Sequence, residues 1–442
     1  MYSTSVKKYP RRLPYLLVTA FMSYAAAIAY PEVLVLDEEA AAAMAAAADA
    51  ATARLRVDAA AGERRTRTAN NFLLPSLTAS AAATEKVASG ADATAPGVVK
   101  LSSGMSLSAA DFQAKTTIGR EAAALRLQAQ AAAERVGRDA RVAFYRLILL
   151  SERVRLAEGA VEVAREGAER TAEEYRNGLS SERVKRQSEV ALAIEKLALE
   201  RARTEAAVAA ADFRSLLGVK EGTELSFSGS LEAPEVAVDG SLAADLSRRT
   251  DLALNAARLA VQESLGAEDR LGRRFPTLSL AATASSEVAD LSPGAAGSLA
   301  DRAVSGASFT VTLSSPNLSA FLPFSKEAET SAALADAEEK LRLEGADLAR
   351  AAKLEVESLL AKLAVSRLAM ASLAESLALA AEVVELTREA YAVGAASYQD
   401  LRTAEKDLDQ ARVDEAAERF SYLSTIIDLE YAVGRRLRPA KE

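Results

Sequence analysis

The sequence of 442 residues contains no cysteine, no histidine and no tryptophan. The absence of cysteine excludes disulfides and thiol nucleophiles, and the absence of histidine excludes imidazole bases and the usual zinc sites. The sequence also has no Walker-type glycine loop and no dinucleotide fingerprint. Carboxylates are abundant, but they follow helical faces that solvent is expected to cover. We therefore predict no catalytic residue, no cofactor and no metal, and we do not expect an enzyme.

Large side chains are scarce as well, because only 5% of the residues are aromatic. Alanine dominates long tracts instead, as in the stretch from Ala40 to Ala53. This composition suits long, closely packed helices better than several bulky cores, because small residues let helices approach closely. We therefore expect a mostly α-helical protein made of long packed helices.

The first residues have the pattern of an export signal. An apolar run from Leu13 to Ile28 follows a basic region and ends at the small residues Ala27 and Ala29, which predicts a signal peptide over residues 1–29. The basic residues removed with it are Lys7, Lys8, Arg11 and Arg12, so the net charge falls from −8 to −12.

Such an acidic chain lacks the clustered Lys and Arg of a protein that binds nucleic acid, so we expect no nucleic-acid partner. No other segment offers about 18 uninterrupted apolar residues, so membrane contact would require a β-barrel or the membrane surface.

The chain repeats itself at an offset of 216 residues. The repeated landmarks are Tyr175 and Gly178 against Tyr391 and Gly394, then Gly218 against Gly434. No insertion is needed between them, so the pattern predicts an internal duplication. We place the first structural repeat at residues 30–226 and the second at 227–442, each with a helix, two strands and a long helical hairpin.

Each half is predicted to contain the same elements in the same order. A first helical stretch (37–69 and 240–272) leads into two strands, then a long helix (about 117–177 in the first half) turns at a glycine into a return helix (about 181–216). The strands are expected over 72–84, 98–110, 274–286 and 305–316, and the alternation of apolar and hydroxyl residues is clearest from Phe309 to Ser314. Both long helices carry apolar or small residues at 3-4-3-4 spacing, which is typical of a coiled-coil seam. These positions are Leu147, Leu150, Val154, Ala157, Val161, Ala164, Ala168, Thr171 and Tyr175, and then Leu363, Ser366, Met370, Leu373, Leu377, Ala380, Val384, Thr387 and Tyr391.

These elements predict a rod with strands at one end. The strands at the edges of this sheet have unpaired backbone groups, so we expect them to pair with strands of other chains. Four strands cannot close a barrel alone, and unpaired edges are not tolerated in lipid, whereas three chains would supply twelve strands. The predicted fold is thus mostly α with a small β part: long antiparallel coiled-coil hairpins plus four strands per chain that complete a trimeric 12-stranded β-barrel. A periplasmic β-patch outside lipid is the alternative, because no outward band of large apolar residues is visible over Ser76 to Thr84.

The layout resembles the TolC-like outer-membrane efflux protein family. The stretch from Arg249 to Leu252 looks like the family's Arg-Pro-Asp-Leu motif with Thr250 in place of proline, and the stretch from Phe275 to Leu280 looks like its Leu-Pro-x-Leu-x-Leu entry to the strands. The Tyr-x-x-Gly motif at both hairpin tips is also similar to the family's. The resemblance covers nearly all of the mature chain.

What the resemblance implies is a homotrimeric duct with its pore in outer-membrane lipid and its helical tunnel in the periplasm. An inner-membrane transporter and a periplasmic adaptor protein would dock at the tip and open it. The duct would be the exit of a tripartite efflux or type I secretion system, and the transport energy would come from the inner-membrane partner.

The resemblance also implies a periplasmic gate at the tips. The family carries an aspartate six residues after the second tip glycine, and here that position is Asp400, six after Gly394. A further aspartate often follows three residues later, where this chain has Thr403, and the matching first-half position is Val184. The constriction is thus expected to be less acidic than in relatives that carry all three. From the residues alone, Asp400 is also simply a favourable negative charge early in a helix.

The tips themselves are similar to the surface that adaptor hairpins engage in this family. The residues concerned are Gly178, Leu179, Val393 and Gly394. Structurally, each glycine is also expected to be the left-handed stop of its helix.

Two other functions are compatible with long helical hairpins. A periplasmic or surface coiled-coil scaffold without a pore would share the helices but has no need of strand pairs that interrupt both halves at matching places. A periplasmic adaptor normally places one helical hairpin between β-rich domains, which two equal hairpins do not fit. The sequence favours the channel.

Overall fold

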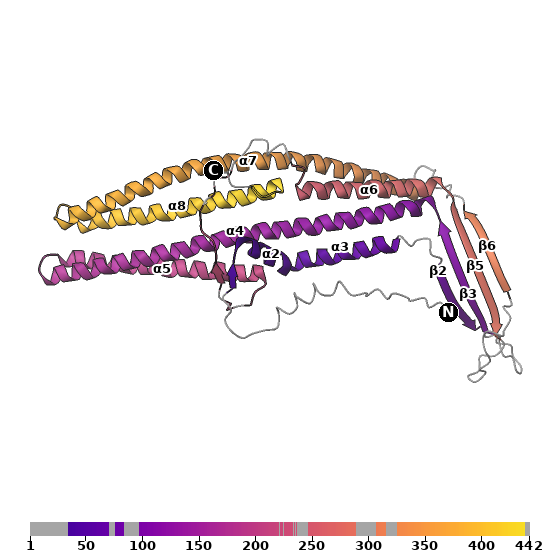
Figure 1. Cartoon of the computed structure of the whole chain (residues 1–442), viewed down its shortest axis with the longest axis horizontal. Coiled ribbons are helices and arrows are strands. Elements are labelled where there is room, and N and C mark those ends of the chain that lie inside the picture. Colours follow the sequence, from indigo (N-terminus) through magenta and orange to yellow (C-terminus); the bar gives the residue numbers. More distant parts are fainter. Residues whose placement is uncertain are drawn as a thin grey trace, which may run out of the picture.

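A computed structural model describes residues 34–69, 76–83, 97–220, 222–223, 225–232, 234, 236, 246–288, 306–314 and 325–437. The signal peptide predicted for residues 1–29 lies outside the described residues. Within them the protein is an elongated, mostly helical molecule with a small sheet at one end (Figure 1). The predicted fold class, mostly α with a small β part, is confirmed at this level.

Two long helical hairpins dominate the molecule. The first joins α4 (Ala109–Arg176) to α5 (Glu182–Leu217), and the second joins α7 (Lys326–Ala392) to α8 (Tyr398–Val433). The 68 residues of α4 span about 100 Å at the standard helical rise. The α4 and α7 helices differ in length by one residue, and α5 and α8 have 36 residues each. These lengths support an internal duplication, which stays a prediction.

The ends of the long helices are set by local capping residues. The predicted start of the first long helix near residue 117 is wrong, because α4 begins at Ala109. There the backbone N–H of Ser108 donates to Asp111 Oδ2 at 2.7 Å, and the Asp111 N–H donates to Ser108 Oγ at 3.2 Å, which completes a capping box. The predicted glycine stops are confirmed, since Gly178 and Gly394 have φ of 71° and 77°.

The predicted coiled-coil seams are the surfaces along which each hairpin packs. Leu147, Leu150 and Ala164 are buried in the first hairpin, and Leu363 and Val384 in the second. Tyr175 differs from the other seam positions because it is 41% exposed at the tip. The 3-4 spacing therefore identifies the packed faces along nearly the whole length of both hairpins.

The shorter helices depart from their predicted bounds. The predicted helix 37–69 is two helices, α2 (Glu38–Ala48) and α3 (Ala50–Ala69), because Asp49 has an extended ψ of 118° and caps α3 by accepting from Thr52 N at 2.6 Å. The predicted helix 240–272 is α6 (Thr250–Arg274). An alanine-rich tract shows no glycine or proline at this break, so its sequence alone favours one helix.

The sheet contains β2 (Ser76–Ala83), β3 (Gly97–Leu107), β5 (Thr277–Val288) and β6 (Gly306–Ser314), in the antiparallel order β2-β3-β5-β6. The expected strands 98–110 and 274–286 are corrected by one to three residues at each end, whereas the ends expected at 72, 84, 305 and 316 lie outside the described residues. A second, unpredicted sheet pairs β1 (Leu34–Leu36) with β4 (Leu225–Phe227) in parallel. Three residues are too few for a periodic pattern, and β4 crosses the boundary predicted between residues 226 and 227.

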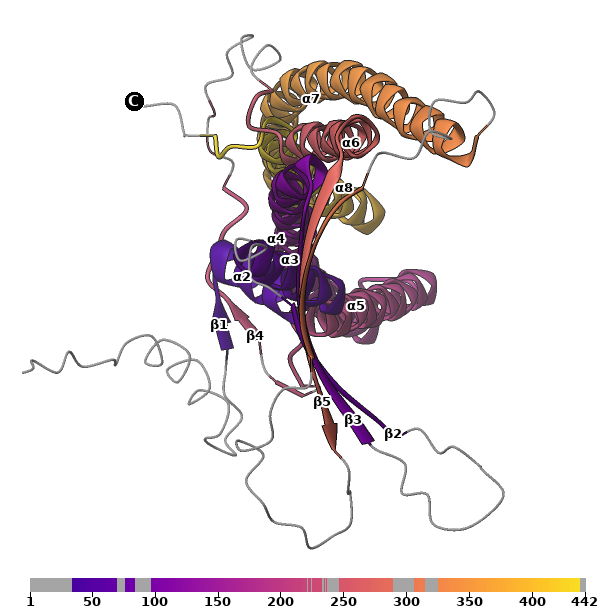
Figure 2. The same cartoon turned by 90° about the vertical axis from the view of Figure 1, so that its right-hand side faces the viewer.

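The elements form a wall four columns wide (Figures 1 and 2). Column 1 contains β2, α3 and α5, column 2 contains β3 and α4, column 3 contains β5, α6 and α8, and column 4 contains β6 and α7. Near the sheet α3 packs on α4, α4 on α6 and α6 on α7, and toward the tips α5 packs on α4, α4 on α8 and α8 on α7. The wall therefore has two edges, column 1 and column 4.

Candidate functional site

The sheet has two chemically different faces. In the strand register, Leu280 of β5 lies between Met105 of β3 and Val311 of β6. Leu278 likewise lies between Leu107 of β3 and Leu313 of β6. We call this side the apolar face. Its described apolar members are Met105, Leu107, Leu278, Leu280, Ala282, Phe309, Val311 and Leu313, and Ser103 lies on the same side opposite Ala282. The opposite, hydroxyl face contains Ser102, Ser106, Ser279, Thr283, Ser308, Thr310, Thr312 and Ser314. An outward apolar band is hard to draw from the sequence over Ser76 to Thr84, but it can be drawn over β3, β5 and β6 because it arises only when neighbouring strands are aligned. The side chains of Ser76 to Thr84 lie outside the described ones.

The apolar face lacks a covering layer within the described part of the chain. Phe309, Val311 and Leu313 are 70%, 57% and 68% exposed. On the hydroxyl face, Ser279 Oγ donates to Thr312 O at 3.3 Å, and the hydroxyls of Thr283 and Ser308 lie 2.5 Å apart. One side of the sheet therefore suits hydrocarbon and the other suits water.

Both edges of the sheet are open in a single chain. Among the described strands β2 pairs only with β3, and β6 only with β5. An unpaired edge presents a row of backbone N–H and C=O groups to any strand that can add to it. These edges belong to columns 1 and 4, which are the edges of the whole wall.

The helical edges carry uncovered apolar stripes. The stripe on α7 and its C-cap residue consists of Val365, Leu368, Leu379, Val383, Leu386 and the C-cap Val393, which are 50–81% exposed. This surface explains why α7 has an 18-residue stretch apolar enough to cross a membrane by length and composition, with a mean hydropathy of 1.4. Since α7 already packs on α8 toward the tip, we interpret the stripe as a second packing face on α7, displaced from the seam that faces α8.

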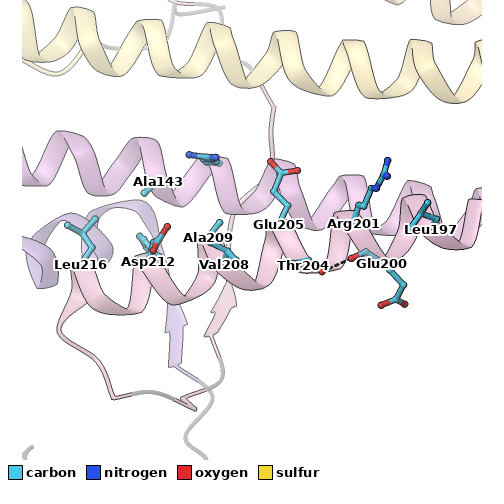
Figure 3. Close-up of a pocket in the computed structure, with 12 residues that line it drawn as sticks. Ala143, Leu197, Glu200, Arg201, Thr204, Glu205, Val208, Ala209, Asp212 and Leu216 are labelled. Carbon is cyan, nitrogen blue, oxygen red and sulfur yellow. Dashed lines mark hydrogen bonds between the residues drawn. The ribbon is translucent and has the colours of Figure 1, made fainter.

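On the other edge, α5 carries Val190, Ile194, Leu197 and Val208, which are 53–60% exposed. A groove of about 790 Å³ runs beside it, and Figure 3 shows Leu197, Val208 and Leu216 on α5 together with the charged Arg201 and Glu205. The two wall edges are therefore different surfaces, and each leaves apolar side chains uncovered in a single chain.

The three residues predicted for the gate lie at the tip end, where the return helices begin. Asp400 and Thr403 are exposed on the first turns of α8, and Val184 is half-buried on the first turn of α5. Asp400 forms a capping box with Ser397, since the Ser397 N–H donates to Asp400 Oδ2 at 2.9 Å and the Asp400 N–H donates to Ser397 Oγ at 3.2 Å. Val184 occupies the same position in α5, the third residue after the N-cap, so only α8 has an acidic side chain at this position.

The Asp400 carboxylate is held ionised by its cap. The hydrogen bonds from the Ser397 hydroxyl and from the Ser397 backbone lower the pKa of Asp400 below its ordinary 3.8. Its contribution to helix stability is present above pH 3.8 and is lost as the pH falls through the lowered pKa. The charge that a gate would use is thus permanent at neutral pH.

The residues predicted for adaptor contact form the outermost turn of each hairpin. Leu179 is 80% exposed and Val393 is 81% exposed. A Cβ added to Gly178 or Gly394 would meet nothing within 4 Å. Each tip therefore presents a glycine turn beside one exposed apolar side chain, and its contact with an adaptor stays a prediction.

The contacts that hold the two hairpins together near the tips have no counterpart in any sequence motif. Tyr391 OH donates to Glu174 Oε1 at 3.3 Å, and Arg402 lies 3.5 Å from Glu195 Oε1. The ring of Tyr398 packs over Gly167, where a Cβ would lie 3.0 Å from its hydroxyl. These partners are separated by some 200 residues or more and by no shared motif, so only the fold brings them together.

A second missed cluster joins the hairpins at the waist, where α2, β1, β4 and the last turn of α8 meet. Arg141 of α4 pairs with Glu38 of α2, and its Nη2 lies 2.7 Å from Glu430 Oε2 of α8. Arg436 reaches Glu38 at 3.0 Å and Glu430 at 3.2 Å, and Tyr145 OH donates to Glu38 Oε2 at 2.7 Å. We call these five residues the waist cluster.

Within the described residues, no group of three or more His, Cys, Asp or Glu side chains is placed to hold a metal ion. The polar clusters instead connect helices to one another.

Solved outer-membrane channels are similar to this chain over nearly its whole length. VceC, an outer-membrane protein from Vibrio cholerae, is 15% identical with a TM-score of 0.73 over 90% of this chain and 96% of its own. The CmeC outer-membrane channel of Campylobacter jejuni is 16% identical with a TM-score of 0.75 over 92% and 87%. The MtrE outer-membrane channel of Neisseria gonorrhoeae, solved in its open state, is 16% identical with a TM-score of 0.75 over 90% and 89%.

No protein-family model matches the chain, and no curated protein matches it in sequence. At identities of 15–16%, the structural likeness establishes the fold. It is the fold expected from the resemblance to TolC-like outer-membrane efflux proteins, and that expectation is confirmed.

Proposed function

We propose that this chain is one subunit of a trimeric outer-membrane channel whose helices form a tunnel in the periplasm. The observation that carries the proposal is the four-column wall with two different uncovered edges and a two-faced sheet. Four strands cannot close, since small barrels need about eight or more. Three copies give twelve strands and a closed ring.

The edges determine how copies would join. Column 1 of one subunit would lie against column 4 of the next, which is a head-to-tail contact that closes when the rotation returns to its start. This arrangement pairs β2 with β6 and removes every open edge of the barrel. It also covers the apolar stripes of α5 and α7.

The two faces of the sheet define which side meets lipid. The apolar face of Met105, Leu280 and Val311 would contact the hydrocarbon of the outer membrane, and the hydroxyl face would line the pore. The helical part would then extend about 100 Å into the periplasm.

Such a channel would serve as the exit duct of a tripartite efflux or type I secretion system. A periplasmic adaptor would engage Leu179 and Val393 at the tips, and an inner-membrane transporter would supply the energy, so the duct itself performs no catalysis. If the tips move apart on opening, the contacts of Tyr391 with Glu174 and of Arg402 with Glu195 have to break.

The native mass of the mature protein, extracted from the cell envelope with and without detergent, tests this proposal. We expect a detergent-dependent particle of three chains that conducts ions in a planar bilayer. A monomer or dimer that is soluble without detergent would exclude the channel and favour the periplasmic coiled-coil scaffold.

The gate can be tested separately by ion selectivity. We expect Asp400→Ala to lower the cation preference of the open channel severalfold and Val184→Asp to raise it, because acidic rings attract cations. The readout is the reversal potential under a salt gradient, with trimer yield measured because Asp400 also caps α8. Asp407→Ala, at another exposed acid of α8, is the control. Equal shifts for Asp400→Ala and Asp407→Ala would show that Asp400 is not the selective residue.

A further inference from the structure

We propose that neighbouring subunits are aligned by a charged seam, in which basic α3 of one copy lies antiparallel to the acidic first part of α7 in the next copy. The proposal rests on the ring proposed above, and it adds the partner surface and its register. It concerns the part of the wall nearest the sheet.

The α3 helix is basic on the side that faces away from the subunit. Its packed side contains Thr52, Ala59 and Gly62, and a Cβ on Gly62 would lie 3.2 Å from Ala122 of α4. The opposite side carries Val57, which is 64% exposed, and Arg64. Five arginines against Asp58 and Glu63 give the helix a net charge of +3. The arginines are Arg54, Arg56, Arg64, Arg65 and Arg67, and within the described residues only Arg67 makes an ion pair.

The first part of α7 is acidic on the corresponding side. Between Lys326 and Asp347 there are seven acidic and three basic residues, so the net charge is −4. Its packed side faces α6, where Gln262 donates to Leu334 O at 3.2 Å. The opposite side carries Asp336 and Glu339, which are exposed and make no ion pair in the described part of the chain, and Leu343, which is 59% exposed.

The two surfaces lie at the same level of the wall. Gly62 of α3 meets α4 at Ala122, and five residues nearer the sheet Thr117 lies 3.0 Å from Ser264 of α6. Gln262, two residues away in α6, reaches Leu334 of α7. Because α4 and α7 both run from the sheet to the tip, Gly62 is level with α7 a few residues beyond Leu334.

The spacing of exposed residues permits one antiparallel register. Val57 and Arg64 are seven residues apart, and so are Asp336 and Leu343, which places both members of each pair on one helical face two turns apart. Val57 can therefore meet Leu343 while Arg64 meets Asp336.

Nearer the tips, the exposed apolar residues of α5 and α7 also match in spacing when the two helices lie antiparallel. On α5, Val190, Leu197 and Val208 are separated by seven and eleven residues. On α7, Leu386, Leu379 and Leu368 are separated by the same seven and eleven residues in the opposite direction. The two edges thus match in apolar spacing near the tips and in charge near the sheet.

The charged contact between α3 and α7 fixes the register, whereas the apolar contact between α5 and α7 alone would permit other registers. A displacement of α7 by two turns would place Arg64 against Leu343 and would leave Asp336 unpaired. Opposite charges also raise the association rate and are screened by salt, so assembly is expected to slow as ionic strength rises.

Because the chain has no cysteine, introduced cysteine pairs report the seam directly. In the full-length channel, Val57→Cys with Leu343→Cys is expected to give disulfide-linked trimers on a non-reducing gel after mild oxidation. The matched control is Val57→Cys with Leu354→Cys, since Leu354 is 65% exposed but lies about 16 Å farther along α7. Linking of the control pair as efficiently as the test pair would overturn the register.

Charge-reversal variants test the charged seam independently of the proposal that the chain forms a trimer. Arg64→Asp is expected to reduce trimer yield in detergent, and Arg64→Asp with Asp336→Arg is expected to restore it. If the wild type is a trimer but the test pair does not link and Arg64→Asp has no effect, the seam is wrong and the channel stands. If the wild type is not a trimer, both proposals fail.

Discussion

Replacing Arg141 by leucine is expected to destabilise the folded protein by about 3–5 kcal/mol, the typical cost of removing one partner from a buried ion pair. Arg141 is only 11% exposed and Glu430 only 7%, and the guanidinium lies between Glu430 and Glu38. Leucine would leave Glu430 with only the half-exposed Arg436 as a cationic partner. The effect should be large because the waist cluster joins α2, α4 and α8, which come from both halves of the chain.

The measurement is the midpoint of urea or thermal unfolding, followed by circular dichroism of the detergent-solubilised protein. Arg126→Leu is the control, because Arg126 is 62% exposed and pairs with Glu63 at 2.8 Å. Its loss should cost at most about 1 kcal/mol, as for other exposed pairs. Equal midpoints for the two variants would show that the waist cluster does not stabilise the fold.

The waist cluster should also make stability depend on pH. Burial of Glu38 opposes its ionisation, but the hydrogen bond from Tyr145 and the charge of Arg141 outweigh burial and hold the pKa of Glu38 below its ordinary 4.5. A lowered pKa stabilises the fold above pH 4.5, and this contribution is lost as the pH falls through the lowered value. The Arg141→Leu variant should lose part of this acid sensitivity.

The second large effect is expected on the sheet, where Val311→Arg should prevent stable insertion into the outer membrane. An arginine on the lipid face of a barrel costs about 2–4 kcal/mol near the middle of the bilayer, and a trimer contains three copies. Thr312→Arg, one residue along β6, should insert normally because Thr312 belongs to the hydroxyl face. The neighbouring position is therefore a matched control in the same strand.

Insertion is measured as the fraction of protein recovered in outer-membrane fractions and as the yield of trimer in detergent. If the channel forms, Thr312→Arg should also shift its selectivity toward anions, as added positive charge does in a pore. Equal tolerance of both substitutions would place the sheet outside lipid and would support the periplasmic β-patch.

The parts of the fold that depend on a regular spacing of apolar residues or on a local motif could be predicted from the sequence. The seam through Leu147 and Leu363 and the stops at Gly178 and Gly394 depend on residues close together in the chain, and the structure has them where they were expected. The break at Asp49 was not predictable, because it depends on one extended residue inside an alanine tract. The β1–β4 pair was also missed, because each strand has three residues.

The candidate site depended more on distant contacts. The apolar face of the sheet needs the alignment of Leu280 with Met105 and Val311, and no single strand shows it. The partners in the waist cluster are up to 398 residues apart. Sequence patterns report faces of single elements, whereas these features arise from which faces the topology brings together. The roles of Asp400, Thr403 and Val184 stay predictions.

The columns of the wall also differ in mechanical continuity. Columns 1 and 3 are interrupted at the waist, between α3 and α5 and between α6 and α8, whereas α4 and α7 are unbroken over 68 and 67 residues. An unbroken helix resists extension along its axis, since each turn is fastened to the next by backbone hydrogen bonds. A force applied at the first tip is therefore carried along α4 and through Ser108 into β3. That strand is hydrogen-bonded to β2 on one side and to β5 on the other, so the tension is shared across the sheet and does not peel away an edge strand.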